Sequence, residues 1–348
     1  MNPAFDTVLA TDAETRAGLF AATAQRLGST PQNVEKDLWV CWTLDVLFNG
    51  RPAGGPRLLF KGGTSLSKGR GPISRFSEDI DVTVFRDDLG QAFSIAELEA
   101  MSRTKRVAAL NAIRHACREF IQGRLREELS AVIAATAVRT GLPTKGFEVR
   151  LDPEDEQTLL LAYPAATAAD AYVRPWVKIE SGAKSALDPH SPLVIRPYVE
   201  PDLPGLDLAV GHVTTVEAER TFWDKVVILH GLRRRFEVTG EFRGDGQRVS
   251  RHYYDLHRLM ESEVGPRALA DPALGADCVR HARLFFNRPE LDLATAKAGT
   301  FTLAPVGDMV EALRRDYGAM SAMIFGPIPA IQAVLQSVAA LEARLNAG

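Results

Sequence analysis

The stretch KGGTSLSKGRGPISRFSEDIDVTV, residues 61–84, joins a glycine-rich turn to two aspartates on a short apolar strand. Leu58 to Phe60 precede the glycines and predict one strand, and Ile80 to Phe85 predict a second. A helical pattern can begin after the glycines, and strands that alternate with helices are typical of α/β proteins. This stretch therefore predicts that the first half of the chain is an α/β domain.

The turn has features that suit an anion. Gly62, Gly63, Thr64 and Ser65 follow the first predicted strand. Glycine lets a backbone approach an anion closely, and free N–H groups at the start of a helix favour phosphate, to which the two hydroxyls would add donors. Strand-to-helix turns also need glycine for steric reasons alone, so this turn does not by itself establish a phosphate site.

The two aspartates suit a divalent cation. Asp79 and Asp81 are separated by one residue, and because side chains of a strand alternate between faces, both carboxylates project from one face about 6–7 Å apart. Oxygen ligands of this kind suit Mg²⁺, which takes one or two carboxylates together with substrate phosphates. The alternative is a hydrated edge strand, or salt bridges from these aspartates to Lys61 and Arg75.

A third carboxylate favours the metal hypothesis. In RPWVKIE, residues 174–180, Val177 and Ile179 alternate with polar residues, so Glu180 is expected on the polar face of a strand. Two metal ions about 4 Å apart need more than two acidic ligands, and one such acid can also serve as the base for an attacking hydroxyl.

The order of the Gly-Gly-Thr-Ser turn, the paired aspartates and the later glutamate resembles the DNA polymerase β-like nucleotidyltransferase superfamily. The string RFSEDID at residues 75–81 resembles the AbiEii/MenT family of toxin nucleotidyltransferases. Further strings are similar to that family in the same order: VEKDLWV at 34–40, VKIE at 177–180, ERTFWDKV at 219–226, RHYYDL at 251–256 and DYGAMSAMIFG at 316–326.

The resemblance implies a role for each of these residues. Asp79, Asp81 and Glu180 would form a site for Mg²⁺ or Mn²⁺, with Glu180 also acting as the base. An NTP would be the nucleotide substrate. Its contacts would come from the turn and from three basic side chains: Lys61, Gly62, Gly63, Thr64, Ser65, Arg75 and Lys225.

For Lys225 and Asp255, in the second half of the chain, the sequence offers a structural explanation as well as the functional role that the resemblance implies. Lys225 shares a predicted helix face with apolar residues, where a lysine ordinarily extends its ammonium group into solvent; by resemblance it would reach the triphosphate. Asp255 lies four residues after Arg251 and can pair with it across one helical turn; by resemblance it would act beside the nucleotide or the acceptor.

Periodicity predicts a change of architecture after the first 208 residues. We expect a mixed-sheet nucleotidyltransferase α/β domain with N-terminal helices over residues 1–208 and a mostly helical domain over residues 209–348. The predicted helices cover 12–28, 33–48, 94–138, 214–234, 252–262, 276–287, 306–321 and 329–345. The predicted strands of the first half include 147–151, 158–163 and 173–181, followed by proline-rich turns over 189–204 and, farther on, by a polar stretch over 236–250.

The composition is that of a cytoplasmic globular protein. The chain has 348 residues, 46% of them hydrophobic and 24% charged, a net charge of −3 and three cysteines that are far apart in the sequence. We see no secretory signal and no stretch long and apolar enough to span a membrane. Basic residues nevertheless concentrate locally: between Arg220 and Arg258 there are nine Lys and Arg against five Asp and Glu.

The sequence as a whole favours a metal-dependent nucleotidyltransferase. By resemblance the acceptor is RNA, with the acceptor end of tRNA favoured, and the setting is a toxin–antitoxin or phage-defence pair with a cognate antitoxin protein as a possible partner. Two alternatives stay open: a nucleotidyltransferase that modifies a hydroxyl of a small molecule or a protein, and a module that senses NTP without turning it over.

Overall fold

The computed structural model describes residues 1–70, 73–168, 174–242, 248–321 and 323–347. Contacts between residues group the chain into two compact units. The first unit comprises Met1–Gly69, Phe76–Ser94 and Met101–Val216. The second unit comprises Arg70–Arg75, Ile95–Ala100 and Glu217–Gly348.

The first unit is built on a mixed sheet of seven strands in the order β3-β4-β5-β2-β1-β7-β6. Neighbouring strands are parallel in the pairs β2/β5 and β1/β7 and antiparallel in the other four. The strands are β1 (Leu58–Lys61), β2 (Asp79–Val84), β3 (Glu148–Leu151), β4 (Thr158–Ala162), β5 (Trp176–Gly182), β6 (His190–Ile195) and β7 (Val210–Val216). The expected mixed-sheet α/β architecture is therefore confirmed.

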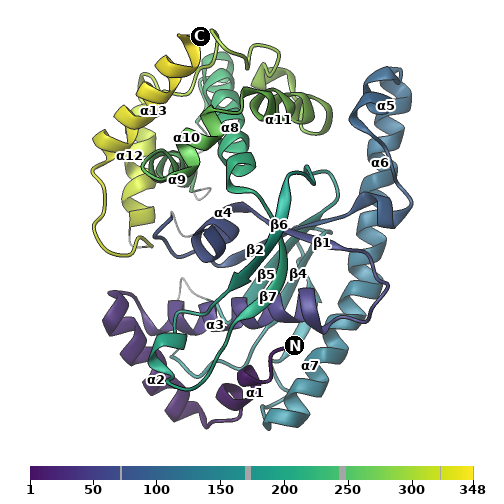
Figure 1. The fold of residues 1–348 in the computed structure, drawn as a ribbon, viewed down its shortest axis with the longest axis vertical. Helices are drawn as coiled ribbons and strands as arrows, with labels where there is room; N and C mark the ends of the chain where they lie inside the picture. Colours follow the sequence, from purple (N-terminus) through teal and green to yellow (C-terminus); the bar gives the residue numbers. More distant parts are fainter. Residues whose placement is uncertain (71–72, 169–173, 243–247, 322, 348) are drawn as a thin grey trace. The chain divides into compact units, whose positions relative to one another are not determined.

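Helices cover this sheet. They are α1 (Ala4–Leu9), α2 (Ala13–Leu27), α3 (Pro31–Asp45), the single turn α4 (Gly62–Ser65), α6 (Arg103–Phe120) and α7 (Arg126–Thr140). Short π-helical segments follow three of them, at Val46–Gly50, Leu66–Arg70 and Ile121–Leu125, and 3-10 turns lie at Arg86–Leu89 and Glu200–Asp202. In Figure 1, α3 runs along the sheet, and it contacts β2, β5 and β7.

Helix α3 is the central helix of the first unit. Thr30 caps its N-terminus by accepting a hydrogen bond from the backbone N–H of Asn33, and Pro31 occupies the first turn, where a missing N–H costs nothing. Every residue from Val34 to Asp45 is buried. Within this helix Trp39 stacks on Tyr163 with ring centroids 5.0 Å apart, so aromatic packing joins α3 to the end of β4.

Three details between residues 94 and 217 differ from the sequence-based expectation. The long helix expected over 94–138 is interrupted at Ser102, whose side chain caps α6 by accepting from the N–H of Lys105. The proline-rich stretch forms strand β6; it lies at the edge of the sheet and pairs only with β7, so the missing N–H of Pro192 is tolerated. Strand β7 extends to Val216, so the helix expected from residue 214 begins only at Ala218. Residue 173, the expected first residue of the third strand, lies outside the described residues.

In its described part, the second unit consists of helices joined by loops, with one isolated β-bridge between Arg75 and Ile324. Its helices are α5 (Ile95–Ala100), α8 (Ala218–Thr239), α9 (Ser250–Met260), α10 (Val264–Leu269), α11 (Pro272–Phe285), α12 (Asp308–Ser321) and α13 (Ile331–Asn346), with a 3-10 turn at Pro289–Leu291. Of these, α10 was not expected, and residues 243–247 of the polar stretch 236–250 lie outside the described residues. The helical second half expected from periodicity is confirmed.

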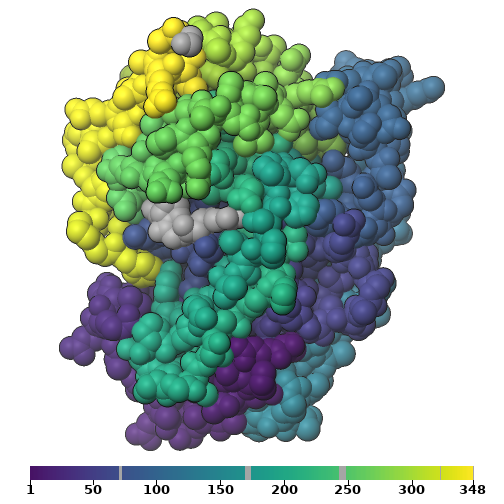
Figure 2. All heavy atoms as spheres, in the orientation of Figure 1, coloured from purple at the N-terminus to yellow at the C-terminus, as the bar shows by residue number. Residues whose placement is uncertain are grey.

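Helix α13 illustrates why these segments are helical. Val334, Val338 and Leu341 are buried at spacings of four and three residues, which is one stripe of an α-helix. The other faces of the helix are open, and its yellow spheres lie on the surface in Figure 2. No helix in the described parts of the chain has the length and apolar character needed to cross a membrane.

Candidate active site

A row of charged side chains crosses the sheet of the first unit. Asp81 of β2 is the register partner of Lys61 on β1 and of Glu180 on β5, and Asp79 is the partner of Lys178. Residues that pair directly across strands project from the same face of a sheet. The burial patterns agree, because the row is half-buried while the residues between its members are buried. The predicted alternation around the two aspartates and around Glu180 is therefore confirmed.

Asp79 is the residue of this row that lacks a partner. Its carboxylate forms no hydrogen bond and no ion pair with any residue that the structure describes. Burial and the negative charges of Glu78, Glu180 and Asp81 together raise the pKa of Asp79 to about 6, against the opposing charge of Lys36. A carboxylate that is half-buried, unpaired and surrounded by other carboxylates lacks a positive charge, which a divalent cation would supply.

The other two carboxylates of the row have lysine neighbours. The ammonium of Lys61 lies 3.8 Å from Oδ1 of Asp81, and that of Lys178 lies 2.8 Å from Oε1 of Glu180. Within the described ranges, three or more His, Cys, Asp or Glu side chains are nowhere grouped so that they could hold a metal ion. Mg²⁺ needs only one or two protein carboxylates when substrate phosphates complete its shell, so Asp79 and Asp81 fit such an ion. A third ligand from Glu180 stays a prediction.

The glycine segment directly adjoins Asp81. Helix α4 begins at Gly62 itself, without the separate turn that was expected. Gly62 has φ +80°, and a Cβ atom there would lie 2.1 Å from Oδ2 of Asp81. Only glycine allows this backbone conformation and this close approach together. The backbone at Gly62 and the half-buried Gly63 thus lies beside the carboxylate that is predicted to bind a metal.

The hydroxyls of this segment are used inside the fold. Thr64 is buried and donates its hydroxyl hydrogen to the backbone carbonyl of Asp79, while its Oγ1 lies 2.7 Å from Oγ of Ser77. Ser65, also buried, donates to the carbonyl of Gly62 at 2.9 Å. The bonds of Thr64 fasten α4 to the start of β2. Both hydroxyls are engaged within the fold, so their contacts with a phosphate stay a prediction.

Lys225 and Asp255, both in the second unit, form a buried ionic cluster with Arg75. Arg75 donates from Nε to Oδ1 of Asp255 at 2.8 Å and from Nη2 to Oδ2 at 2.9 Å, and the ammonium of Lys225 lies 2.8 Å from Oδ2. The exposed fractions of the three side chains are 5%, 0% and 6% for Arg75, Asp255 and Lys225. Lys225 therefore does not extend into solvent, and the bonds of Asp255 go to Arg75 and Lys225 and not along the helix to Arg251.

The electrostatics of this cluster follow from one carboxylate shared by two cations. Burial alone would raise the pKa of Asp255, but the charges and hydrogen bonds of Arg75 and Lys225 hold that pKa well below its usual range. The pKa of Lys225 is lowered, first by burial and then by the nearby charge of Arg75, with Asp255 opposing both. The cluster carries one more positive than negative charge, so it favours an anion nearby.

Two buried ion pairs beside the carboxylate row were not predicted. The ammonium of Lys36 on α3 lies 2.6 Å from Oε2 of Glu78, the residue before Asp79. The next residue, Asp37, lies 2.7 Å from the ammonium of Lys68, in the segment that follows α4. The string VEKDLWV contained both α3 residues, but their partners are more than 30 positions away and no local pattern identifies them.

Comparisons with known proteins identify the family of the chain. The family model described as "Nucleotidyl transferase AbiEii toxin, Type IV TA system" matches residues 45–340. Among solved structures, the chain is similar to the MenT4 nucleotidyltransferase toxin of Mycobacterium tuberculosis H37Rv, with 15% sequence identity and a TM-score of 0.43 over 95% of this chain and 98% of that chain. A comparison with curated proteins gives no match. Since the family model covers most of its length, the chain belongs to the AbiEii family, the nucleotidyltransferase toxins of type IV toxin–antitoxin systems.

Proposed function

We propose that the protein transfers a nucleoside monophosphate from an NTP to RNA, with the acceptor end of tRNA as the favoured target, and that it does so with Mg²⁺ or Mn²⁺ held by Asp79 and Asp81. The observation that carries this proposal is the unpaired carboxylate of Asp79, whose pKa is raised to about 6, two residues from Asp81 on the same strand β2. A divalent cation bound there would neutralise the carboxylates and the triphosphate.

The residues of the first unit divide the remaining work. The backbone at Gly62 and Gly63 lies beside Asp81 and is placed to receive phosphate oxygens. Lys61 supplies positive charge at the same end of β1. In the transfer, the acceptor hydroxyl oxygen forms a bond to the α-phosphorus, the bond to pyrophosphate breaks, and the hydroxyl proton passes to a base. Glu180 is the base we propose, because it is 41% exposed and the ammonium of Lys178, 2.8 Å away, orients its carboxylate.

For the second unit we propose that Lys225 offsets the charge of the triphosphate and that Asp255 positions it. The cluster's excess of one positive charge supports an anionic ligand, and Arg75 would share that ligand. Asp255 holds both cations through three short contacts, so it acts on the nucleotide through them.

The choice of RNA rests on charge and on the family. The segment from Arg220 to Arg258 carries a local excess of four positive charges, nine Lys and Arg minus five Asp and Glu, in a chain of net charge −3. The type IV toxin–antitoxin family implies a growth-inhibiting activity in the bacterial cytoplasm and a cognate antitoxin that relieves it. Membership alone does not specify the acceptor, so the acceptor must be identified directly.

The test uses purified protein, α-labelled NTPs, total RNA and either Mg²⁺ or EDTA. Wild type should label RNA only with the metal, and sequencing of RNA 3′ ends should find nucleotides added to tRNA. Asp79→Ala should abolish transfer, whereas Asp87→Ala, which removes an exposed acid outside the row, should not. Labelling that falls steeply with salt supports an RNA acceptor, because each phosphate contact releases counterions. Label found only on a small molecule or on protein, or NTP binding without turnover, would contradict the proposal.

A further inference from the structure

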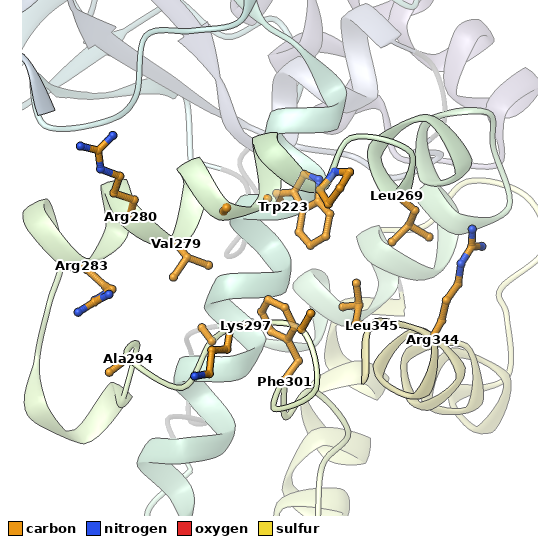
Figure 3. Close-up of a pocket in the computed structure, with 15 residues that line it drawn as sticks. Trp223, Leu269, Val279, Arg280, Arg283, Ala294, Lys297, Phe301, Arg344 and Leu345 are labelled. Carbon is orange, nitrogen blue, oxygen red and sulfur yellow. The ribbon is translucent and has the colours of Figure 1, made fainter. Parts of the chain in front are cut away.

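The second unit contains a cavity of about 560 Å³ that the proposed reaction does not use. Figure 3 shows its walls, which come from α8, α11, the end of α13 and the loop before α12. Cavities of this size, within about 300–1,000 Å³, are typical of small-molecule sites. We call it the basic pocket, because four of its lining residues are Arg or Lys and none is Asp or Glu.

The floor of the basic pocket is apolar and fixed in place. Trp223 donates a hydrogen bond from its indole N–H to the carbonyl of Ala268 at 3.0 Å, which sets the orientation of the ring. Phe301 lies beside it, with ring centroids 6.5 Å apart. Gly275 of α11 lets that helix approach the indole directly, since a Cβ atom there would lie 2.8 Å from the ring. Alanines form much of the remaining wall and leave the cavity its width.

The rim of the pocket carries unpaired positive charge. Arg283, Lys297 and Arg344 are exposed, and none of them forms an ion pair within the described parts of the chain. The fourth cation, Arg280, is bound to Glu99 and is therefore neutralised. Figure 3 shows Arg283 and Lys297 on one side of the floor and Arg344 on the other. A ligand that satisfies all three cations must present negative charge on both sides of an apolar group.

We propose that the basic pocket binds one nucleotide of a single-stranded RNA, with the base over the apolar floor and the two flanking phosphates on the rim cations. A nucleic-acid strand carries a phosphate on each side of every base, which is the charge arrangement that the rim requires. The floor offers few polar groups to read a base edge, so contact is through the base face and tolerates any base. This inference rests on the proposed RNA acceptor and assigns it a binding site.

The first test measures binding apart from catalysis. Asp79→Ala protein, in EDTA and without NTP, is titrated with a short fluorescent single-stranded RNA at several salt concentrations. The pocket variant combines Arg283→Gln, Lys297→Gln and Arg344→Gln. Each of the two flanking phosphates should contribute about 0.7 to the magnitude of the slope of log K against log salt, so losing both contacts should lower it by about 1.4, roughly a 14-fold loss of affinity at ~0.15 M salt.

A matched control separates the pocket from general charge. Arg126→Gln, Lys145→Gln and Arg315→Gln remove three exposed cations without ion pairs, also two arginines and one lysine, and take the net charge from −3 to the same −6. This control should bind RNA within a few-fold of the parent. Ala276→Trp, at an exposed wall position, fills the pocket without changing charge and should weaken binding while the salt slope changes little.

Each outcome of these binding experiments either supports or overturns the inference. Equal losses in the pocket variant and the control would overturn the inference, because binding would then follow net charge alone; so would unchanged binding in both the pocket variant and Ala276→Trp. If a polyglutamate peptide bound as tightly as RNA and was lost in the same pocket variant, the site would be for an acidic protein segment. Failure of nucleotide transfer to RNA, with RNA still bound through the pocket, would refute the proposed activity and leave this inference intact.

Discussion

Replacing Asp79 by asparagine should stabilise the metal-free protein while it abolishes transfer. The pKa of Asp79 is about 6 in the folded chain, against about 3.9 for an unperturbed aspartate. One pKa unit corresponds to about 1.4 kcal/mol, so the ionised carboxylate costs the fold up to about 3 kcal/mol above pH 6. Because Asp79 is only half-buried, about 1–3 kcal/mol is the range we expect, and Asp79→Asn removes that cost without changing the shape of the side chain.

The pH dependence of the free energy of unfolding determines the direction of the expected change. A raised carboxyl pKa means that the folded state holds the proton more tightly than the unfolded state. The contribution of Asp79 to stability is therefore greatest below about pH 4 and is lost as the pH rises to about 6. Asp79→Asn should be more stable than wild type at about pH 7.5, and the difference should vanish near pH 4.

Urea unfolding of EDTA-treated protein at these two pH values measures the effect, with Asp87→Asn as a control for a surface acid. Addition of Mg²⁺ should then stabilise wild type, because an ion that binds only the folded state raises its stability, and should not stabilise Asp79→Asn. A variant less stable than wild type at neutral pH, or a difference of the same size at both pH values, would refute the assignment of Asp79 as an uncompensated carboxylate.

Four further substitutions test the buried contacts. Asp255→Asn leaves Arg75 and Lys225 buried without their carboxylate and should cost about 3–5 kcal/mol in urea unfolding, whereas Lys225→Met keeps the bidentate Arg75–Asp255 pair and should cost clearly less; equal costs would contradict this account. Gly62→Ala must move Asp81, so transfer should fall about 100-fold while stability falls by only ~2 kcal/mol, as kinetics and unfolding together would measure. Gly275→Ala gains about 1 kcal/mol of helix propensity but presses a Cβ on the Trp223 ring, so a melting curve should show net destabilisation by about 1–2 kcal/mol, and a rise in melting temperature would exclude the close approach.

Sequence reasoning succeeded where the determinant is local. The alternation of β2 and of β5 follows from a side-chain period of two, so the exposed face of Asp79, Asp81 and Glu180 could be read from a few neighbours. What could not be read was the register that places Asp81 directly opposite Glu180, since it depends on the packing of strands about 100 residues apart. The prolines around Pro192 predicted turns where the structure has strand β6. Proline is tolerated in a strand at the edge of a sheet, but an edge strand cannot be recognised before the order of the strands is known.

The partners within the buried cluster of Arg75, Lys225 and Asp255 also could not be predicted from local sequence. Asp255 had a plausible partner four residues away on its own helix, yet its carboxylate is bonded to Arg75, 180 positions earlier, and to Lys225. Burial decides between these partners. A fully buried carboxylate requires charges that are also removed from water, and a partly exposed helix neighbour cannot supply them. The sequence alone does not tell which of many arginines will be buried.

The string VEKDLWV illustrates how charged residues can resemble catalytic ones while they hold the site together. Glu35, Lys36 and Asp37 are at most 3% exposed, on a helix that is buried on all sides. Successive residues of a helix point about 100° apart, so three consecutive charges in a buried helix face three different segments. Glu35 accepts from the backbone N–H groups of Ala166 and Thr167.

The other two charges of this string hold the segments on either side of the predicted metal ligands. Lys36 binds Glu78 next to Asp79, and Asp37 binds Lys68 in the segment after α4. Isolated buried charges would cost several kcal/mol each, so every one of these contacts must form for α3 to be buried at all. The same contacts fix where β2 begins and where the segment after α4 runs. If either ion pair separated, a buried lysine or carboxylate would be left without its partner. Burial of α3 and placement of the carboxylate row therefore depend on the same ion pairs.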